Sequence, residues 1–142
     1  MKNSHDQARR WVEFLADQPS IPFARLLRTQ FDAGAITRFC DCGCNSFEHS
    51  VPSRPDIEPL THAGPTTGAF FEAVFELGSG EQIGFLFFAD ARGNLAGIDI
   101  TLGAGNHGRL PEHPRVGSLL YTTSLRSNNS VEGDAAKPRA SR

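Results

Sequence analysis

The sequence predicts an α+β fold in which two N-terminal helices pack on an antiparallel β-meander of about five strands. Between residues 5 and 34, apolar side chains recur at the spacing of a helical face. After that point they alternate with polar side chains, and turn sequences rich in glycine, asparagine and aspartate separate the alternating runs. The length of 142 residues suits one domain, which we expect to span residues 1–125.

The first helix is predicted over His5–Ala16. Four apolar residues in this range follow the i, i+3, i+4, i+7 spacing of one helical face, and Pro19 ends the helix soon afterwards. We expect this face to pack on the sheet. It consists of Ala8, Trp11, Val12 and Leu15.

The second helix is predicted to begin after Ser20, which is a suitable N-cap. Pro22 then lies in the first turn, where its missing N–H costs nothing. Gly34 is predicted to be the C-terminal cap. The apolar stripe of this helix consists of Phe23, Leu26, Leu27 and either Gln30 or Phe31.

A β-hairpin is predicted after the helices, because the apolar pattern changes at Ala35 from a helical period to one nearer two residues. Gly43 and Asn45 tolerate left-handed backbone angles and would form the turn. Phe47–Val51 would return as the second strand. We expect it to be an edge strand whose unpaired backbone groups could pair with a second copy of the chain.

The stretch from Val51 to Gly68 is predicted to be a long loop or an irregular edge. It contains four prolines, each of which lacks the N–H that a sheet ladder needs. Loops of this length are often functional or mobile, and both interpretations stay open. The prolines are Pro52, Pro55, Pro59 and Pro65.

The strongest alternation predicts the strands of the meander. The first of them spans residues 69–77, and the second, residues 82–89, is apolar on both faces and should be central or covered on both sides. A third strand is predicted over residues 96–102. Residues 116–121 are predicted to form a last short strand or a helical turn.

Composition and charge favour a cytoplasmic protein that binds neither nucleic acid nor membrane. The formal net charge is −2, whereas nucleic-acid-binding domains usually carry a clustered positive excess. No run of about 18 apolar residues is present, and the N-terminal segment is too polar for a signal peptide. Three cysteines are an odd number and a poor disulfide framework. Four arginines are interpreted as a solvated helix face: Arg9, Arg10, Arg25 and Arg28.

Three cysteines within five positions form the sharpest motif. Cys40, Cys42 and Cys44 supply thiolates, and with the imidazole of His49 they have the chemistry of a zinc site. Their C-x-C spacing differs, however, from the knuckles of structural zinc sites. Two other interpretations stay open. The cysteines pack as small apolar side chains, or one of them is a redox or catalytic thiol with His49 as its base.

The remaining polar features receive structural interpretations. Residues 103–108 match G-x-G-x-x-G, but Pro111 follows where a phosphate-binding helix would begin, so a flexible loop is predicted. Residues 126–142 are polar and are predicted to be a disordered tail. Three carboxylates are predicted to lie on a solvated face of the sheet: Glu72, Glu76 and Asp99.

Three segments carry a resemblance to other proteins: Arg38–Phe47, which contains C-x-C-G-C-x-S, Gly84–Phe88 and Gly93–Asp99. In these segments the chain resembles small uncharacterised bacterial proteins with two N-terminal helices, a C-x-C-G-C-x-S-like hairpin and a β-meander. The likeness covers about Trp11–Leu120 and implies the fold but no activity. In size and architecture the chain also resembles immunity proteins that neutralise bacterial toxins, which implies a protein partner.

These observations predict a non-enzymatic cytosolic module that binds another protein, such as a toxin or effector, through a sheet edge or the proline-rich loop. No cofactor is expected unless the cysteines hold zinc. The alternative is a metal- or thiol-dependent protein that uses Cys40, Cys42 and Cys44, with zinc or redox chemistry. A third candidate is an enzyme that acts on a small molecule in a pocket beneath the helices.

Overall fold

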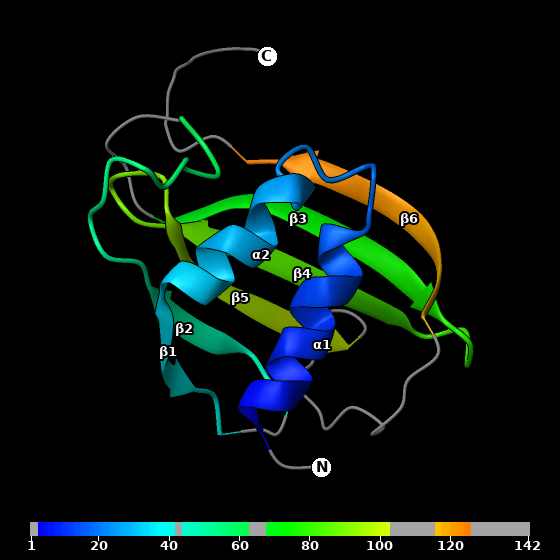
Figure 1. The fold of residues 1–142 in the computed structure, drawn as a ribbon. Coiled ribbons are helices and arrows are strands. Elements are labelled where there is room, and N and C mark those ends of the chain that lie inside the picture. Colours follow the sequence, from blue (N-terminus) through cyan, green and yellow to red (C-terminus); the bar gives the residue numbers. More distant parts are fainter. Residues whose placement is uncertain (1–2, 42–43, 63–67, 103–115, 126–142) are drawn as a thin grey trace.

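The structure, a computed structural model, describes residues 3–41, 44–62, 68–102 and 116–125. Two helices, α1 (His5–Ala16) and α2 (Ala24–Ala33), lie side by side on one face of a six-stranded antiparallel sheet (Figure 1). The predicted α+β fold with N-terminal helices on an antiparallel sheet is therefore confirmed, with one strand more than the five or so expected. Among the described residues, no helix is long and apolar enough to cross a membrane.

The sheet has the strand order β1-β2-β5-β4-β3-β6. Strands β3, β4 and β5 are consecutive neighbours and form the predicted meander, with β4 at its centre as its two apolar faces indicated. The prediction of an edge strand at 47–51 is wrong, because β2 lies between β1 and β5. The edges are β1 and β6. The strands are β1 (Ala35–Phe39), β2 (Phe47–Ser50), β3 (Gly68–Leu77), β4 (Gln82–Ala89), β5 (Leu95–Leu102) and β6 (Val116–Ser124).

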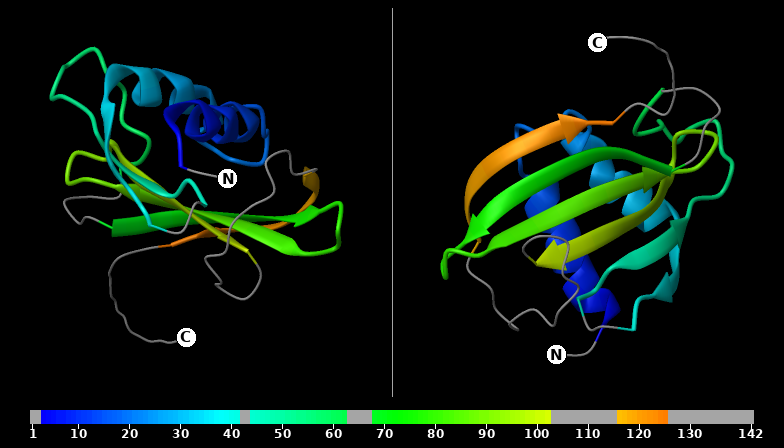
Figure 2. Two further views of the ribbon diagram at one scale, coloured as in Figure 1. Left: turned by 90° about the horizontal axis from the view of Figure 1, so that it is seen from below. Right: turned by 180° about the vertical axis from the view of Figure 1, so that it is seen from behind.

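An aromatic layer between the helices and the sheet forms the core. Trp11 of α1 contacts Phe85 of β4 with ring centroids 5.2 Å apart, and Phe14 contacts Phe75 of β3 at 5.1 Å. Figure 2 (left) shows both helices on the same side of the sheet. Because each aromatic side chain buries about 150–250 Å², this layer contributes a large apolar area to the core.

The second helix begins later than predicted. Phe23 occupies the N-cap position, and the residues before it form turns in which the Ile21 amide donates to the Gln18 carbonyl at 3.2 Å. Ile21 precedes Pro22, and a residue before proline is disfavoured in the helical region. A helix capped by Ser20 would need Ile21 in that region, so the helix starts after the proline.

Gly34 follows α2 as predicted, but for a different reason. Its φ of −118° is extended, so no left-handed cap forms. A Cβ atom at this position would lie 2.1 Å from the Ser50 carbonyl oxygen and 2.5 Å from Cε1 of His49. Glycine is therefore required because β2 passes so close to the end of α2.

A buried amide joins α2 to the rest of the fold. Gln30 is fully buried, and its Nε2 donates to the Glu58 carbonyl at 2.8 Å and to Oδ1 of Asn94 at 2.9 Å. Its Oε1 accepts from the Leu95 amide at 2.8 Å. These bonds attach the helix to the start of β5 and to the loop after β2.

The described part of the proline-rich loop, residues 51–62, contains no helix or strand. Ile57 and Leu60 are nevertheless buried in the core, and the Leu60 amide donates to the Gly93 carbonyl at 2.8 Å. This part of the loop is therefore packed against the domain. The predicted glycine loop at 103–108 and the predicted tail at 126–142 lie outside the described residues.

Candidate functional site: the β6 edge and the cysteine hairpin

The final strand is the most exposed element of the described structure. Among the described strands β6 pairs with β3 alone, and every residue from Gly117 to Ser124 is exposed. Its outer backbone groups face away from the sheet, as in any edge strand. Figure 2 (right) shows β6 as the orange border of the sheet, at the opposite edge from β1.

A register shift in β6 presents three large apolar side chains. Val74 of β3 pairs with Tyr121, and the next residue, Phe75, pairs with Leu119, so Leu120 is an extra residue in the ladder. Such an insertion bends a strand and re-aims its side chains. The exposed fractions are 37% for Leu119, 43% for Leu120 and 48% for Tyr121.

The two edges of the sheet differ in how they are protected against pairing. Proteins blunt edge strands by keeping them short and by placing charges or prolines in them. β1 has five residues and carries Arg38, which forms an exposed ion pair with Glu48 at 3.1 Å. β6 has nine residues and contains neither a charged residue nor a proline. Within the described residues, the sheet is thus open to strand addition at β6.

The described cysteines lie where the hairpin places them. Cys40 follows β1, and Cys44, which is 1% exposed, precedes β2, with the two Sγ atoms 3.0 Å apart. Sγ of Cys44 lies 3.0 Å from Oγ of Ser46, a hydroxyl that also accepts from the Ile100 amide at 2.7 Å. Cys42 lies outside the described residues. Two cysteine side chains therefore meet beside β5.

Asparagines attach the hairpin to the first helix. The Ser4 amide donates to Oδ1 of Asn45, and the Asn45 amide donates to Oδ1 of Asn3, each at 2.8 Å. The side-chain amide of Asn3 also donates to the Cys40 carbonyl. Asn45 has a φ of 66°, as its predicted role in the turn requires. The start of α1 thus holds the cysteine segment in place.

His49 lies under α2, buried against the ring of Phe31 with centroids 5.5 Å apart. Its Nε2 is 3.2 Å from the Phe31 carbonyl oxygen, and its Nδ1 is 3.3 Å from that of Leu95. A neutral imidazole donates to one of these oxygens. The pKa of His49 is lowered, because burial outweighs the opposite effect of the hydrogen bonds to the two carbonyls. Both ring nitrogens therefore face backbone oxygens.

Among the described residues, no group of three or more histidine, cysteine, aspartate or glutamate side chains is placed to hold a metal ion. The predicted set was Cys40, Cys42, Cys44 and His49, and one of its members is outside the described part of the chain. The zinc and thiol hypotheses accordingly stay predictions.

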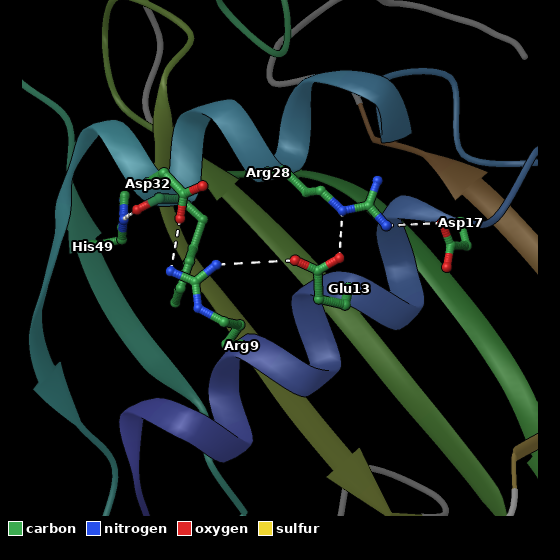
Figure 3. A network of polar contacts seen from close by, with 7 residues as sticks. Arg9, Glu13, Asp17, Arg28, Asp32 and His49 are labelled. Atoms are coloured by element: carbon green, nitrogen blue, oxygen red, sulfur yellow. Dashed lines mark hydrogen bonds and ion pairs between the residues drawn. The ribbon is translucent and has the colours of Figure 1, made fainter.

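Two of the helix arginines, Arg9 and Arg28, form ion pairs across the outer face (Figure 3). Nη2 of Arg9 in α1 lies 2.7 Å from Oδ1 of Asp32 in α2. Arg28 of α2 is paired with Glu13, and its Nη2 is 2.8 Å from Oδ1 of Asp17. Hydrogen bonds to Asp17 and Glu13 raise the pKa of Arg28. This pairing favours the solvated-face interpretation over phosphate binding.

The three predicted surface carboxylates do not form a pair. Glu72 and Asp99 each lie opposite Leu86 of β4, one on either side, so an apolar residue separates them in the sheet. Glu76 is exposed near the end of β3. This arrangement is that of a solvated face rather than of an acid–base pair.

Comparisons with known protein families, with curated proteins and with solved structures each found no match to this chain.

The feature that sequence reasoning missed is the extent of the last strand. The prediction ended it at residue 121 and left a helical turn as an alternative, whereas β6 continues to Ser124. The available signal was the absence of charge from Val116 to Ser124, which together with β-branched and aromatic residues is typical of a strand rather than a surface loop.

Proposed function

We propose that this protein is a non-enzymatic, cytoplasmic binding module that recognises another protein by adding an extended segment of it to β6. The observation that carries the proposal is the edge itself, nine residues long and without charge or proline. In strand addition, main-chain hydrogen bonds supply affinity and alternate side chains supply specificity. The β6 edge offers both.

The side chains of β6 support a protein partner in particular. Tyrosine is enriched in protein interfaces, and charged residues are depleted at their centres. Leu119, Leu120 and Tyr121 lie together in the middle of an uncharged strand. An added strand with apolar side chains at matching positions would cover them and remove their surface from water.

The partner that we propose is a toxin or effector of the same bacterial cell. This part rests on the resemblance in size and architecture to toxin-immunity proteins and on the exposed edge described above. Such a module would act by occupying its partner, with no chemical step.

Affinity capture from cells of the source organism tests the proposal. The baits are the wild-type protein, Leu120→Lys, which places a charge in the middle of β6, and Thr37→Lys, a matched change in the exposed edge strand β1. We expect one partner in stoichiometric amount with wild type and Thr37→Lys, and its loss with Leu120→Lys. Capture of the same proteins by all three baits, or of none by wild type, would contradict the proposal.

A second candidate function is a zinc or redox site in the hairpin. Sγ of Cys40 lies 3.0 Å from Sγ of Cys44, which is disulfide-bonded in the structure, so this approach favours the redox form, and a zinc site would need that disulfide reduced. Cys42 belongs to the same motif. Cys40→Ser and Cys44→Ser should then lower metal content, measured by elemental mass spectrometry, or the reactivity of the thiols. Unchanged metal content, reactivity and stability would leave packing as the role of these cysteines.

A further inference from the structure

The face of the sheet opposite the helices holds a pocket of about 540 Å³. It is formed by residues of β1, β2, β5 and β4, at the other end of the strand order from β6, so it is independent of the proposed binding edge. Figure 2 (right) shows this face of the sheet. Its volume falls in the range of roughly 300–1,000 Å³ that small-molecule sites occupy.

A glycine makes the middle of the pocket hollow. Glu48 of β2 pairs with Gly97 of β5, and Gly97 pairs in turn with Phe88 of β4. Residues paired in this way share a face of the sheet. A Cβ atom on Gly97 would lie 2.6 Å from the carbonyl oxygen of Phe47, so no larger residue fits there without moving β2 away from β5. The row therefore has a gap beside Phe88.

The residue next to the gap adds little to the lining. The register between β4 and β5 shifts after Phe88, because the next residue, Ala89, pairs with Leu95. Ala96 is thus an extra residue in β5, and such an insertion re-aims a side chain. Ala96 belongs to the lining, to which it adds only a methyl group. The floor of the pocket consequently consists of main chain and one small side chain.

The charged residues of the lining have partners within the protein. Nη2 of Arg38 lies 3.1 Å from Oε2 of Glu48. Oδ1 of Asp90 accepts from the amides of Arg92 at 2.8 Å and Asn94 at 3.0 Å in the turn after β4. These charges are therefore already compensated before any ligand enters.

Two further polar residues of the lining are engaged in the same way. Asp99 has an interaction of its own. Oγ of Ser46 accepts from the Ile100 amide at 2.7 Å and lies 3.0 Å from Sγ of Cys44. In the described lining, every carboxylate and guanidinium thus has a partner already, and the pocket selects neither a cation nor an anion.

We propose that this pocket binds a small neutral aromatic molecule with a flat body of about two fused rings. Phe88 supplies an aromatic wall, where a ring pair gains attraction beyond the area that it buries, and the main chain at Gly97 leaves room for a flat ring. A charge moved from water into this lining would lose hydration without gaining a partner, whereas a neutral molecule avoids that cost. The other apolar residues of the lining are Phe39, Phe47, Ala89, Ala96 and Ile98.

Three probes with one aromatic body and different charges test this assignment: naphthylethanol, naphthylethylammonium and naphthylacetate. Binding is measured by titration in ¹H–¹⁵N correlation spectra of the full chain. We expect the alcohol to shift the amide signals of Phe88 and Gly97. It should bind about tenfold more tightly than either charged probe, because a charge that leaves water without a partner costs at least as much as a neutral polar group that does so.

Variants test whether the probe occupies this pocket. Ala96→Leu fills the space above the floor and should abolish the shifts at Phe88 and Gly97, and Phe88→Ala removes the aromatic wall and should weaken binding of the alcohol. Ala35→Leu makes the first of these changes at an exposed position of β1 outside the described lining, and it should bind the alcohol as the wild type does. Thermal unfolding confirms that each variant is folded, and the two pocket variants are independent tests.

Three results would overturn the proposal. The first is binding of the ammonium or the carboxylate probe as tight as that of the alcohol, since a charge in the lining would then take part in recognition. The second is the absence of shifts at Phe88 and Gly97 at millimolar concentration of the alcohol. The third is equal binding of the alcohol by the wild type and both pocket variants. None of these results bears on β6, whose partner is tested by the capture experiment.

Discussion

Leu119 of β6 is the cross-strand partner of Phe75 of β3, yet Leu119 is 37% exposed and Phe75 is 1% exposed. Phe75 is covered by Phe14 of α1, with ring centroids 5.1 Å apart. The apolar layer of the sheet thus continues from beneath the helix to an edge that meets solvent. An added strand at that edge would extend the layer by one element.

The same pair of residues gives a direct test of how the core is built. Phe75→Ala should lower the free energy of unfolding by about 3–5 kcal/mol, because it opens a cavity in a close-packed interior. Leu119→Ala should change it by less than about 0.5 kcal/mol, since the side chain is already partly in water. Urea unfolding of both variants measures the difference. Equal losses of unfolding free energy in the two variants would mean that the Leu119 side chain is covered in solution.

Two glycines allow close contact and backbone strain to be compared. Gly34→Ala places a Cβ atom against the backbone of β2 and should cost near the upper end of the ~1–3 kcal/mol typical of overpacking. Gly80 has a φ of +92° with nothing within 4 Å of its Cβ position, so Gly80→Ala should cost only about 1 kcal/mol of backbone strain. Thermal unfolding of the two variants measures both losses of stability. A larger loss in Gly80→Ala than in Gly34→Ala would contradict the close approach of β2 to α2.

The buried amide of Gln30 should contribute more to the stability of the fold than a glutamine on the surface would. Gln30→Leu replaces the amide by an apolar side chain of similar size and leaves the Leu95 amide and Oδ1 of Asn94 without this partner. Each buried group that loses its hydrogen bond costs about 1–3 kcal/mol. Gln82→Leu, at an exposed position in β4, is the control. If both variants unfold at the same urea concentration, the network contributes nothing.

Much of the fold could be predicted because local patterns determine it. The stripe Ala8–Leu15 gave α1 its observed bounds, and the doubly apolar run at 82–89 indicated a central strand before any pairing was known. The order of the strands could not be predicted in the same way. The alternation of apolar and polar residues indicates which face of Phe47–Ser50 is buried. It does not indicate that this strand, besides pairing with β1, pairs with β5, almost fifty residues later.

The candidate sites were harder to predict, since they depend on register between distant strands. Gly97 appears in the sequence as one of many glycines, and its pocket exists only because Glu48 and Phe88 flank it across two strands. The openness of β6 likewise depends on its position at the edge. The cysteine motif, in contrast, is visible in sequence, and Cys40 and Cys44 do meet.

Stability should depend on pH through His49. Burial lowers its pKa in the folded state, with a smaller contribution in the same direction from the charge of His5, against an ordinary value near 6.5 in the unfolded chain. Below about pH 6.5 the unfolded state therefore takes up a proton that the folded state resists. The free energy of unfolding should be constant above this pH and fall as the pH is lowered toward the folded-state pKa.

Urea unfolding at intervals between pH 7.5 and pH 5.5, a window chosen above the titration of ordinary carboxylates, measures this dependence. His49→Gln should flatten it, whereas His62→Gln, at an exposed position in the loop, should leave it in place. If the free energy of unfolding of His49→Gln still falls with pH as it does in the wild type, the proton is taken up by another group.

The central claim, that a partner adds a strand to β6, is tested most directly by amide hydrogen exchange of the protein alone and in complex with the captured partner. In the free protein, the β6 amides bonded to β3 should exchange slowly and those that face outward should exchange fast. The account predicts that the outward amides between Gly117 and Ser124 become protected in the complex, with no comparable change in β1. Protection elsewhere, with these amides still exchanging fast, would contradict it.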